Sequence, residues 1–194
     1  MNQQEPNRRD FMRRGSRAVA GVAAVTVATP ARPVLGANDR VNIAVIGVRS
    51  RGREHYREWM KIDNVQVRTL CDADENMFAP TVAEVEKVQG KRPKTEYDIR
   101  EVLDDRDIDA VSIATPDHWH ALASIWACQA GKHVYVEKPV SHNIWEGRKI
   151  VDAARRYNRI VAAGMQNRSI GGVRAAIQFL HEGKLGEVYM AKGL

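Results

Sequence analysis

Cysteine is scarce in this sequence of 194 residues, which holds only Cys71 and Cys128. A small secreted domain that depends on disulfides needs several cysteines at regular spacing, and this pair has no such pattern. Cys71 lies at the end of a predicted strand and Cys128 in a predicted helix. We therefore expect two free thiols in a protein that folds in a reducing compartment.

Long apolar runs are also missing. The apolar stretch from Ala18 to Ala28 spans eleven residues, whereas a helix that crosses a bilayer needs roughly 20. The sequence therefore predicts no stable membrane insertion, and it contains no internal repeats or low-complexity tracts. A hydrophobic share of 44% still supports a real core, and the length allows one domain and part of a second.

A strong positive charge is lacking once the first 37 residues are set aside. The whole chain has a formal net charge of +6, but six arginines and only two acids lie in residues 1–37. The remainder carries 24 basic and 22 acidic side chains. This is the surface of an ordinary soluble enzyme rather than one that follows a phosphate backbone, so no nucleic acid partner is expected.

Residues 1–37 resemble an export signal. Arg8 and Arg9, followed by a spacer, Phe11 and an apolar residue, resemble the twin-arginine motif, and the Ala18–Ala28 stretch suits the apolar region of a signal. Cleavage after Ala31 or Ala37 is compatible with the pattern; the alternative is a disordered basic tail. Twin-arginine export carries folded proteins, which suits an enzyme that acquires a cytoplasmic cofactor before it reaches the periplasm or another extracytoplasmic space.

From residue 38 onward, predicted strands alternate with predicted helices, which indicates βαβ units on a parallel sheet. The strands are predicted at residues 41–46, 65–70, 94–97, 110–114, 133–136 and 160–163. The helices are predicted at residues 52–60, 77–88, 99–103, 120–130 and 144–157. The fold class is therefore α/β, a doubly wound Rossmann domain over residues 38–164, with its topological switch point between the first and fourth strands.

The pattern changes after Gly164. A helix is predicted from Val173 to His181, and Glu187 to Ala191 is predicted to begin a new strand. A lone strand without partners is not stable. We therefore interpret residues 165–194 as the start of a second α/β domain, the rest of which is missing.

A candidate phosphate site lies between the first strand and the first helix. The run Gly47-Val48-Arg49-Ser50-Arg51-Gly52 departs from the dinucleotide fingerprint, which has glycine at the third position. Gly47 is expected to make the tight turn and Gly52 to permit close packing of the helix. Arg49 either weakens binding or turns outward to contact phosphate, and Ser50 and Arg51 at the helix start are candidate anion contacts.

An acidic residue follows the second strand at the position where a carboxylate accepts hydrogen bonds from the adenosine ribose. This residue is Asp72, twenty residues beyond Gly52. A carboxylate there repels a 2′-phosphate, so NAD is expected rather than NADP. Asp74 lies nearby and is interpreted as a helix cap.

A polar loop, Thr115 to His120, is predicted directly after the fourth strand, at the switch point where the nicotinamide is expected. Thr115, Pro116 and His118 are its candidate cofactor contacts. Two histidines at i and i+2 without further ligands do not make a zinc site, so no metal is expected. Gln166, after the sixth strand, either reaches the same crevice or caps the turn.

The most informative sequence is Glu137-Lys138-Pro139, which follows the fifth strand. Ligands of open parallel sheets bind outside the carboxyl ends of the strands. Lys138 is therefore a candidate proton-transfer residue for an alcohol or carbonyl, and Glu137 a candidate neighbour of the cofactor. The alternative is an exposed lysine at a strand end.

Taken together, these residues resemble the glucose-fructose oxidoreductase/inositol dehydrogenase/rhizopine-catabolism (Gfo/Idh/MocA) family. The resemblance covers about residues 38–194 and rests on four matching stretches, which are 38–47, 71–74, 115–120 and 137–143. Some members of this family are exported by the twin-arginine route, in keeping with the leader. Arg49 is the main departure from the family pattern, and it bears on cofactor affinity.

The resemblance implies a two-domain NAD(P)-dependent oxidoreductase that acts on sugars, cyclitols or related polyols. Lys138 matches the family lysine that lies near the nicotinamide and the reacting hydroxyl. Further substrate residues, and any oligomer contacts, belong to the missing domain. Two alternatives stay open. One is an NAD-dependent glycosidase of the same family, and the other is a truncated, non-catalytic remnant that binds a nucleotide or nothing.

Overall fold

A computed structural model describes residues 40–193 of the chain. The twin-arginine motif, the apolar stretch and both candidate cleavage sites lie outside these described residues.

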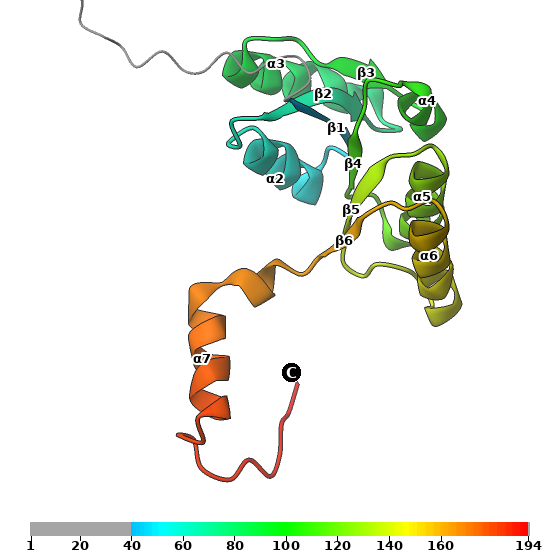
Figure 1. The fold of residues 1–194 in the computed structure, drawn as a ribbon. Helices are drawn as coiled ribbons and strands as arrows, with labels where there is room; N and C mark the ends of the chain where they lie inside the picture. Colours follow the sequence, from blue (N-terminus) through cyan, green and yellow to red (C-terminus); the bar gives the residue numbers. More distant parts are fainter. Residues whose placement is uncertain (1–39, 194) are drawn as a thin grey trace, which may run out of the picture. The chain divides into compact units, whose positions relative to one another are not determined.

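The described residues form one parallel sheet with the strand order β3-β2-β1-β4-β5-β6, and every pairing is parallel (Figure 1). The strands are β1 (Val41–Ile46), β2 (Val65–Cys71), β3 (Lys94–Glu96), β4 (Ala110–Ile113), β5 (His133–Glu137) and β6 (Val161–Gly164). The chain leaves β1 toward one edge and returns beside it at β4. The doubly wound order and its switch point are confirmed.

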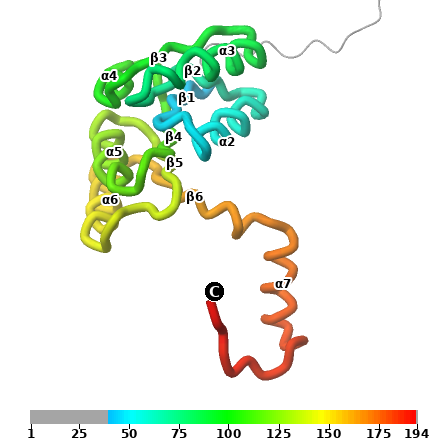
Figure 2. Tube along the Cα trace, turned by 180° about the vertical axis from the view of Figure 1, so that it is seen from behind, coloured from blue at the N-terminus to red at the C-terminus, as the bar shows by residue number. Residues whose placement is uncertain are grey.

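Helices cover both faces of this sheet. They are α2 (Ser50–Trp59), α3 (Phe78–Gln89), α4 (Ile99–Asp104), α5 (Asp117–Gln129) and α6 (Ile144–Arg156), with a 3-10 turn, η2 (Glu75–Met77), before α3. α2 and α3 pack on one face, and α5 and α6 on the other, as Figure 2 shows from behind. Apolar side chains of β1 alternate between the two cores, with Val45 facing α2 and Ile46 facing α5.

Most predicted boundaries agree with the structure to within two residues, but one helix start and one strand were wrong. Helix α5 begins at Asp117 rather than at His120, because the ring of Pro116 sets a backbone conformation that suits the position before a helix. Residues 187–191 form no strand, since no neighbouring strand within the described chain offers them hydrogen bonds. After β6 the structure has a 3-10 turn, η3 (Gln166–Ser169), and helix α7 (Gly171–His181), whose residues are exposed.

Cys71 and Cys128 are both free and buried, as expected. Burial, reinforced by the nearby carboxylates of Asp72, Asp98 and Glu96, raises the pKa of the Cys71 thiol to about 12. A thiol with such a pKa is protonated at neutral pH and is a poor nucleophile. Cys71 is therefore part of the core and not a reactive group.

Candidate functional site

The turn from β1 into α2 has glycine at the two places where a side chain does not fit. Gly47 has a φ of +82°, and a Cβ atom on it would lie 2.8 Å from the backbone of Ala114. A Cβ atom on Gly52 would overlap the carbonyl oxygen of Gly47. The two glycines thus bring β1, β4 and the start of α2 into close contact, as the sequence predicted.

The start of α2 has no side-chain cap and no acidic residue in its first turn. The Gly52 N–H donates to the Arg49 carbonyl oxygen, whereas the Ser50 and Arg51 N–H groups ahead of it have no backbone partner among the described residues. Such groups attract anions. Arg49 has an ordinary extended backbone, with φ −81°, so its side chain in place of glycine causes no backbone strain there. Besides Gly47, the residue of this turn with a positive φ is Ser50, at +33°.

The two arginines of this turn point to different strands. Arg49 is exposed and forms an ion pair with Asp74, beyond the end of β2. Arg51 turns to the end of β5, where its Nε donates a hydrogen bond to Glu137 Oε1 over 2.9 Å. Because β1 and β4 separate β2 from β5 in the sheet, only Arg49 lies on the side of the predicted ribose site.

Asp72 lies directly after β2 and ties that strand to the glycine turn. Its Oδ2 accepts a hydrogen bond of 2.9 Å from the Val48 backbone N–H, and its Oδ1 accepts one of 3.0 Å from the Asp74 N–H. Each carboxylate oxygen has two lone pairs, so both retain capacity for a further donor. Asp74 accepts a hydrogen bond from the Asn76 N–H at the start of η2 and is the predicted cap.

The end of β4 presents an unused hydroxyl. Thr115 Oγ1 is buried and has no hydrogen-bond partner among the described residues. Pro116 precedes α5, and His118 lies exposed in its first turn. His120, which the sequence did not single out, is buried, with Nδ1 2.6 Å from the Pro139 carbonyl oxygen and Nε2 2.8 Å from that of Thr115. Its ring therefore links the ends of β4 and β5.

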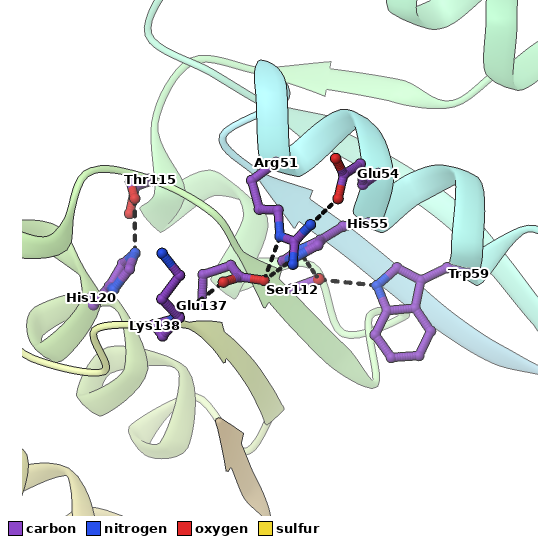
Figure 3. Close-up of polar contacts among 9 residues, drawn as sticks. All are labelled: Arg51, Glu54, His55, Trp59, Ser112, Thr115, His120, Glu137 and Lys138. Atoms are coloured by element: carbon purple, nitrogen blue, oxygen red, sulfur yellow. Dashed lines mark hydrogen bonds and ion pairs between the residues drawn. The ribbon is translucent and has the colours of Figure 1, made fainter. Parts of the chain in front are cut away.

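Glu137 is the most heavily bonded carboxylate of the site (Figure 3). Only 4% of the residue is exposed. Its Oε1 accepts hydrogen bonds from Arg51 Nε at 2.9 Å and His55 Nε2 at 3.0 Å, and its Oε2 accepts one from the Lys138 N–H at 3.1 Å. Burial by itself would raise the pKa of Glu137, but these hydrogen bonds outweigh burial and lower it below 4.5.

Lys138 is exposed at the carboxyl end of β5. Within the described chain, the Glu137 carboxylate forms an ion pair with Arg51 and a hydrogen bond with His55, but no pair with the Lys138 ammonium, and Figure 3 accordingly draws no line from that ammonium. The carboxylate beside Lys138 is thus already paired with Arg51, which also forms an ion pair with the exposed Glu54. The lysine remains available to a ligand.

A further buried contact extends from Glu137 to the opposite end of α2. His55 Nδ1 lies 3.0 Å from Ser112 Oγ in β4, and Trp59 Nε1 donates to the same oxygen over 3.0 Å. The ring of Tyr135 packs edge-on against both His55 and Trp59. We call Trp59, Ser112, His55 and Glu137 the buried relay.

Gln166 lies at the start of η3 and belongs to the same cluster. With its amide nitrogen donating to the Gly164 carbonyl oxygen over 2.6 Å, its amide oxygen accepts a hydrogen bond from the Arg51 guanidinium. The structure therefore brings Arg51, Glu137, Lys138 and Gln166 together at the carboxyl ends of β5 and β6. It separates them from Arg49 and Asp72 at the end of β2.

Sequence reasoning missed His55, Ser112 and Trp59. Two signals were present. Arg51, His55 and Trp59 recur every four residues and therefore share one face of α2. Ser112 is the one polar residue inside the apolar β4, and a buried hydroxyl needs a partner.

Comparison with known proteins agrees with this fold. Residues 41–165 match the model of an oxidoreductase family described as having an NAD-binding Rossmann fold. A curated relative from Shewanella pealeana, named a glycosyl hydrolase family 109 protein, is 30% identical in an alignment 170 residues long that covers 77% of this chain and 37% of the relative. The chain thus spans little more than a third of that relative's length.

Two solved structures are also similar. Myo-inositol 2-dehydrogenase from Lactobacillus plantarum is 25% identical with a TM-score of 0.67, covering 77% of this chain and 43% of that one. Scyllo-inositol dehydrogenase from Lactobacillus casei, solved with NAD(H) and scyllo-inositol, is 25% identical with a TM-score of 0.66, covering 76% of this chain and 43% of that one.

Proposed function

Because the chain belongs to this Gfo/Idh/MocA oxidoreductase family, we propose that the protein transfers hydride between NAD and a hydroxyl group of a sugar, cyclitol or related polyol. The observation that carries the proposal is that the Lys138 ammonium group is not paired with the neighbouring Glu137 carboxylate. Lys138 directly follows β5, which lies next to β4 at the switch point, and its carboxylate neighbour is already paired with Arg51. A ligand hydroxyl can therefore bind its ammonium group.

A nicotinamide dinucleotide fits the residues at this edge of the sheet. Gly47 and Gly52 allow the tight turn that places the start of α2 beside the ends of β1 and β4, and the uncapped start of α2 suits the pyrophosphate. Asp72 has free lone pairs that can accept hydrogen bonds from the ribose hydroxyls. The buried Thr115 hydroxyl has no partner among the described residues, so it can hydrogen-bond a ligand or a water molecule. The carboxylate of Asp72 favours NAD over NADP. When bound, NAD accepts or returns the hydride.

The chain's own contribution is to hold the substrate and move its proton. Lys138 hydrogen-bonds the reacting hydroxyl and takes part in the transfer of its proton as the C–H bond breaks. Glu137, held by Arg51 and His55, supports the backbone of Lys138. Residues 165–194 begin a second, substrate-binding domain, which supplies the other wall of the crevice and any oligomer contacts.

The test is a turnover assay of the full-length protein with NAD and a panel of polyols, read as NADH absorbance. Lys138→Ala should lower turnover by about 10²–10⁴-fold, the usual contribution of general acid–base assistance, and leave NAD affinity nearly unchanged. Lys91→Ala, at an exposed lysine outside the site, is the control. Equal turnover of Lys138→Ala and wild type would contradict the role of Lys138.

A second candidate is an NAD-dependent glycosidase, which the name of the Shewanella pealeana relative favours. Aryl glycosides in the same assay distinguish it, because release of the aryl alcohol without net NADH formation would identify that reaction. Absence of both reactions, with nucleotide binding retained, would identify a non-catalytic nucleotide-binding protein.

We also propose that residues 1–37 direct twin-arginine export to the periplasm or another extracytoplasmic space. The support is the sequence Arg8-Arg9 ahead of Phe11 and the apolar stretch. Among the described residues, no helix is both long and apolar enough to cross a bilayer.

A further inference from the structure

The buried relay has a single consistent arrangement of hydrogens. The Trp59 indole N–H can only donate, so Ser112 Oγ accepts from it. The Ser112 hydroxyl then donates its own hydrogen to His55 Nδ1. The Glu137 carboxylate can only accept, so the hydrogen between the two side chains must belong to His55 Nε2. The hydrogen bonds of the relay therefore all point the same way, from Trp59 through Ser112 and His55 to Glu137.

The same arrangement requires a neutral imidazole. A second proton on His55 Nδ1 would face the Ser112 hydroxyl, whose hydrogen would then need another acceptor. Desolvation acts in the same sense, because burial lowers the pKa of His55 below 6.5, more than the Glu137 hydrogen bond raises it. His55 is therefore the Nε2–H tautomer at neutral pH.

We propose that His55 is a positioning residue, which as the neutral Nε2–H tautomer fixes the Glu137 carboxylate and through it the backbone of Lys138. This inference rests on the proposed hydride transfer for its kinetic consequence. The positioning of Glu137 by His55 depends only on the hydrogen bonds and not on the proposed reaction. Glu137 Oε1 is held by His55 and Arg51, and Oε2 is thereby aimed at the Lys138 N–H.

The Glu137 side chain packs directly against Gly164 of β6. A Cβ atom on Gly164 would lie 2.9 Å from Glu137 Oε1 and 3.2 Å from its Cα. The carboxylate fills the space above this glycine, while Tyr135 closes the relay beside His55 and Trp59. A buried hydrogen-bond network whose members are satisfied favours one arrangement of its side chains. Here that arrangement fixes the position of Glu137 and, through it, the backbone of Lys138.

The first experiment measures the protonation state of His55 and needs no enzymatic turnover. In the uniformly ¹⁵N-labelled chain, two-bond ¹H–¹⁵N spectra distinguish the tautomers of its six histidines, and His55→Gln assigns the His55 signals. We expect a protonated Nε2 and a bare Nδ1 near neutral pH. An Nδ1–H tautomer or an imidazolium would overturn the proposal.

The same spectra test the link to Lys138. Its backbone amide resonance should shift in His55→Ala, which removes the donor, and move back toward the wild-type position in His55→Gln, which retains a side-chain N–H. His133→Gln is the matched control, because His133 lies at the opposite end of β5. An unmoved Lys138 resonance in His55→Ala would contradict the link.

The kinetic experiment uses the full-length protein. By analogy with the outer-sphere partners of metal ligands, His55→Ala should lower kcat about 10–100-fold, with the Kd for NAD unchanged and with partial recovery in His55→Gln. The acid limb of the pH–rate profile should move to higher pH, since Glu137 loses a donor. Unchanged kcat and profile would refute the proposal. A wild-type protein without hydride transfer would instead refute the proposed function, and the spectra would still decide the relay.

Discussion

Gly52 faces the carbonyl group of Gly47 so closely that a Cβ atom on Gly52 would lie 2.7 Å from the Gly47 carbonyl carbon and overlap its oxygen. The obstacle is backbone, which cannot rotate away as a flexible side chain can. Gly52→Ala should therefore lower the free energy of unfolding by about 3 kcal/mol, the upper end for overpacking.

Chemical denaturation followed by circular dichroism measures this loss. Gly172→Ala is the control, because that helical glycine has no atom within 4 Å of its Cβ position. It should change the unfolding free energy by no more than the gain in helix propensity, about 1 kcal/mol. Equal effects of the two substitutions would show that the close approach at Gly52 is not required.

A second prediction compares two serines that are both fully buried. Ser112 Oγ accepts from Trp59 and contacts His55, whereas Ser124 Oγ has no hydrogen-bond partner among the described residues. Ser112→Ala leaves two buried polar groups without partners and should destabilise the protein by about 1–3 kcal/mol. Ser124→Ala removes an unsatisfied hydroxyl and should be neutral or slightly stabilising. The reverse order in urea melts would contradict the relay.

Stability should fall as the solution becomes acidic, in two steps. Burial lowers the pKa of His55 in the folded state, so below 6.5 the unfolded chain binds the proton more readily and stability decreases. The hydrogen bonds of Glu137 lower its folded pKa, so its contribution is present above 4.5 and is lost below that pH. Denaturation from pH 8 down to about pH 2 measures both steps. His55→Gln should remove the step that begins near pH 6.5, and persistence of that step would assign it to other groups.

Cofactor choice gives a fourth prediction. The chain should bind NAD(H) more tightly than NADP(H), because the Asp72 carboxylate repels a 2′-phosphate. Calorimetry with both nucleotides tests this, and equal or tighter NADP binding would contradict it. In that case Arg49→Ala should weaken NADP binding while Arg51→Ala should not do so selectively, because Arg51 is paired with Glu137 on the far side of β1 and β4.

Export gives a fifth prediction. Replacement of both Arg8 and Arg9 by lysine keeps the charge but removes the arginine pair that the twin-arginine pathway reads. The variant should remain in the cytoplasmic fraction of the producing cells, while the wild type appears outside it. Unchanged appearance outside the cytoplasm would reject this pathway.

The sheet was predictable because its information is local. Each strand is an apolar run bounded by a turn, and the alternation with helices fixes a doubly wound order. The glycine turn was equally predictable from the sequence, since Gly47 and Gly52 occupy positions that tolerate no side chain. The start of α5 was missed because Pro116-Asp117 is typical of a turn as well as of a helix start. Residues 187–191 have a strand pattern, but no strand among residues 40–193 pairs with them.

The buried relay was not predictable in the same way. Its members are far apart in the sequence, and His55 becomes adjacent to Glu137 only when β1, β4 and β5 align. Arg51 illustrates the difficulty best. Its position in the glycine turn indicated an anion contact, but the geometry of α2 turns it inward to a carboxylate. Local sequence gives a residue's position, and the tertiary structure decides which neighbour it meets.

The shared face of Arg51, His55 and Trp59 has a consequence for loop engineering. An α-helix advances by about 100° per residue, so a residue inserted in α2 between Arg51 and His55 would turn Arg51 away from the face of His55 and Trp59. Arg51 would then lose its hydrogen bond to Glu137 at the end of β5. A loop exchanged into this turn should therefore end before Ser50, where α2 begins, and leave the spacing of these three residues unchanged.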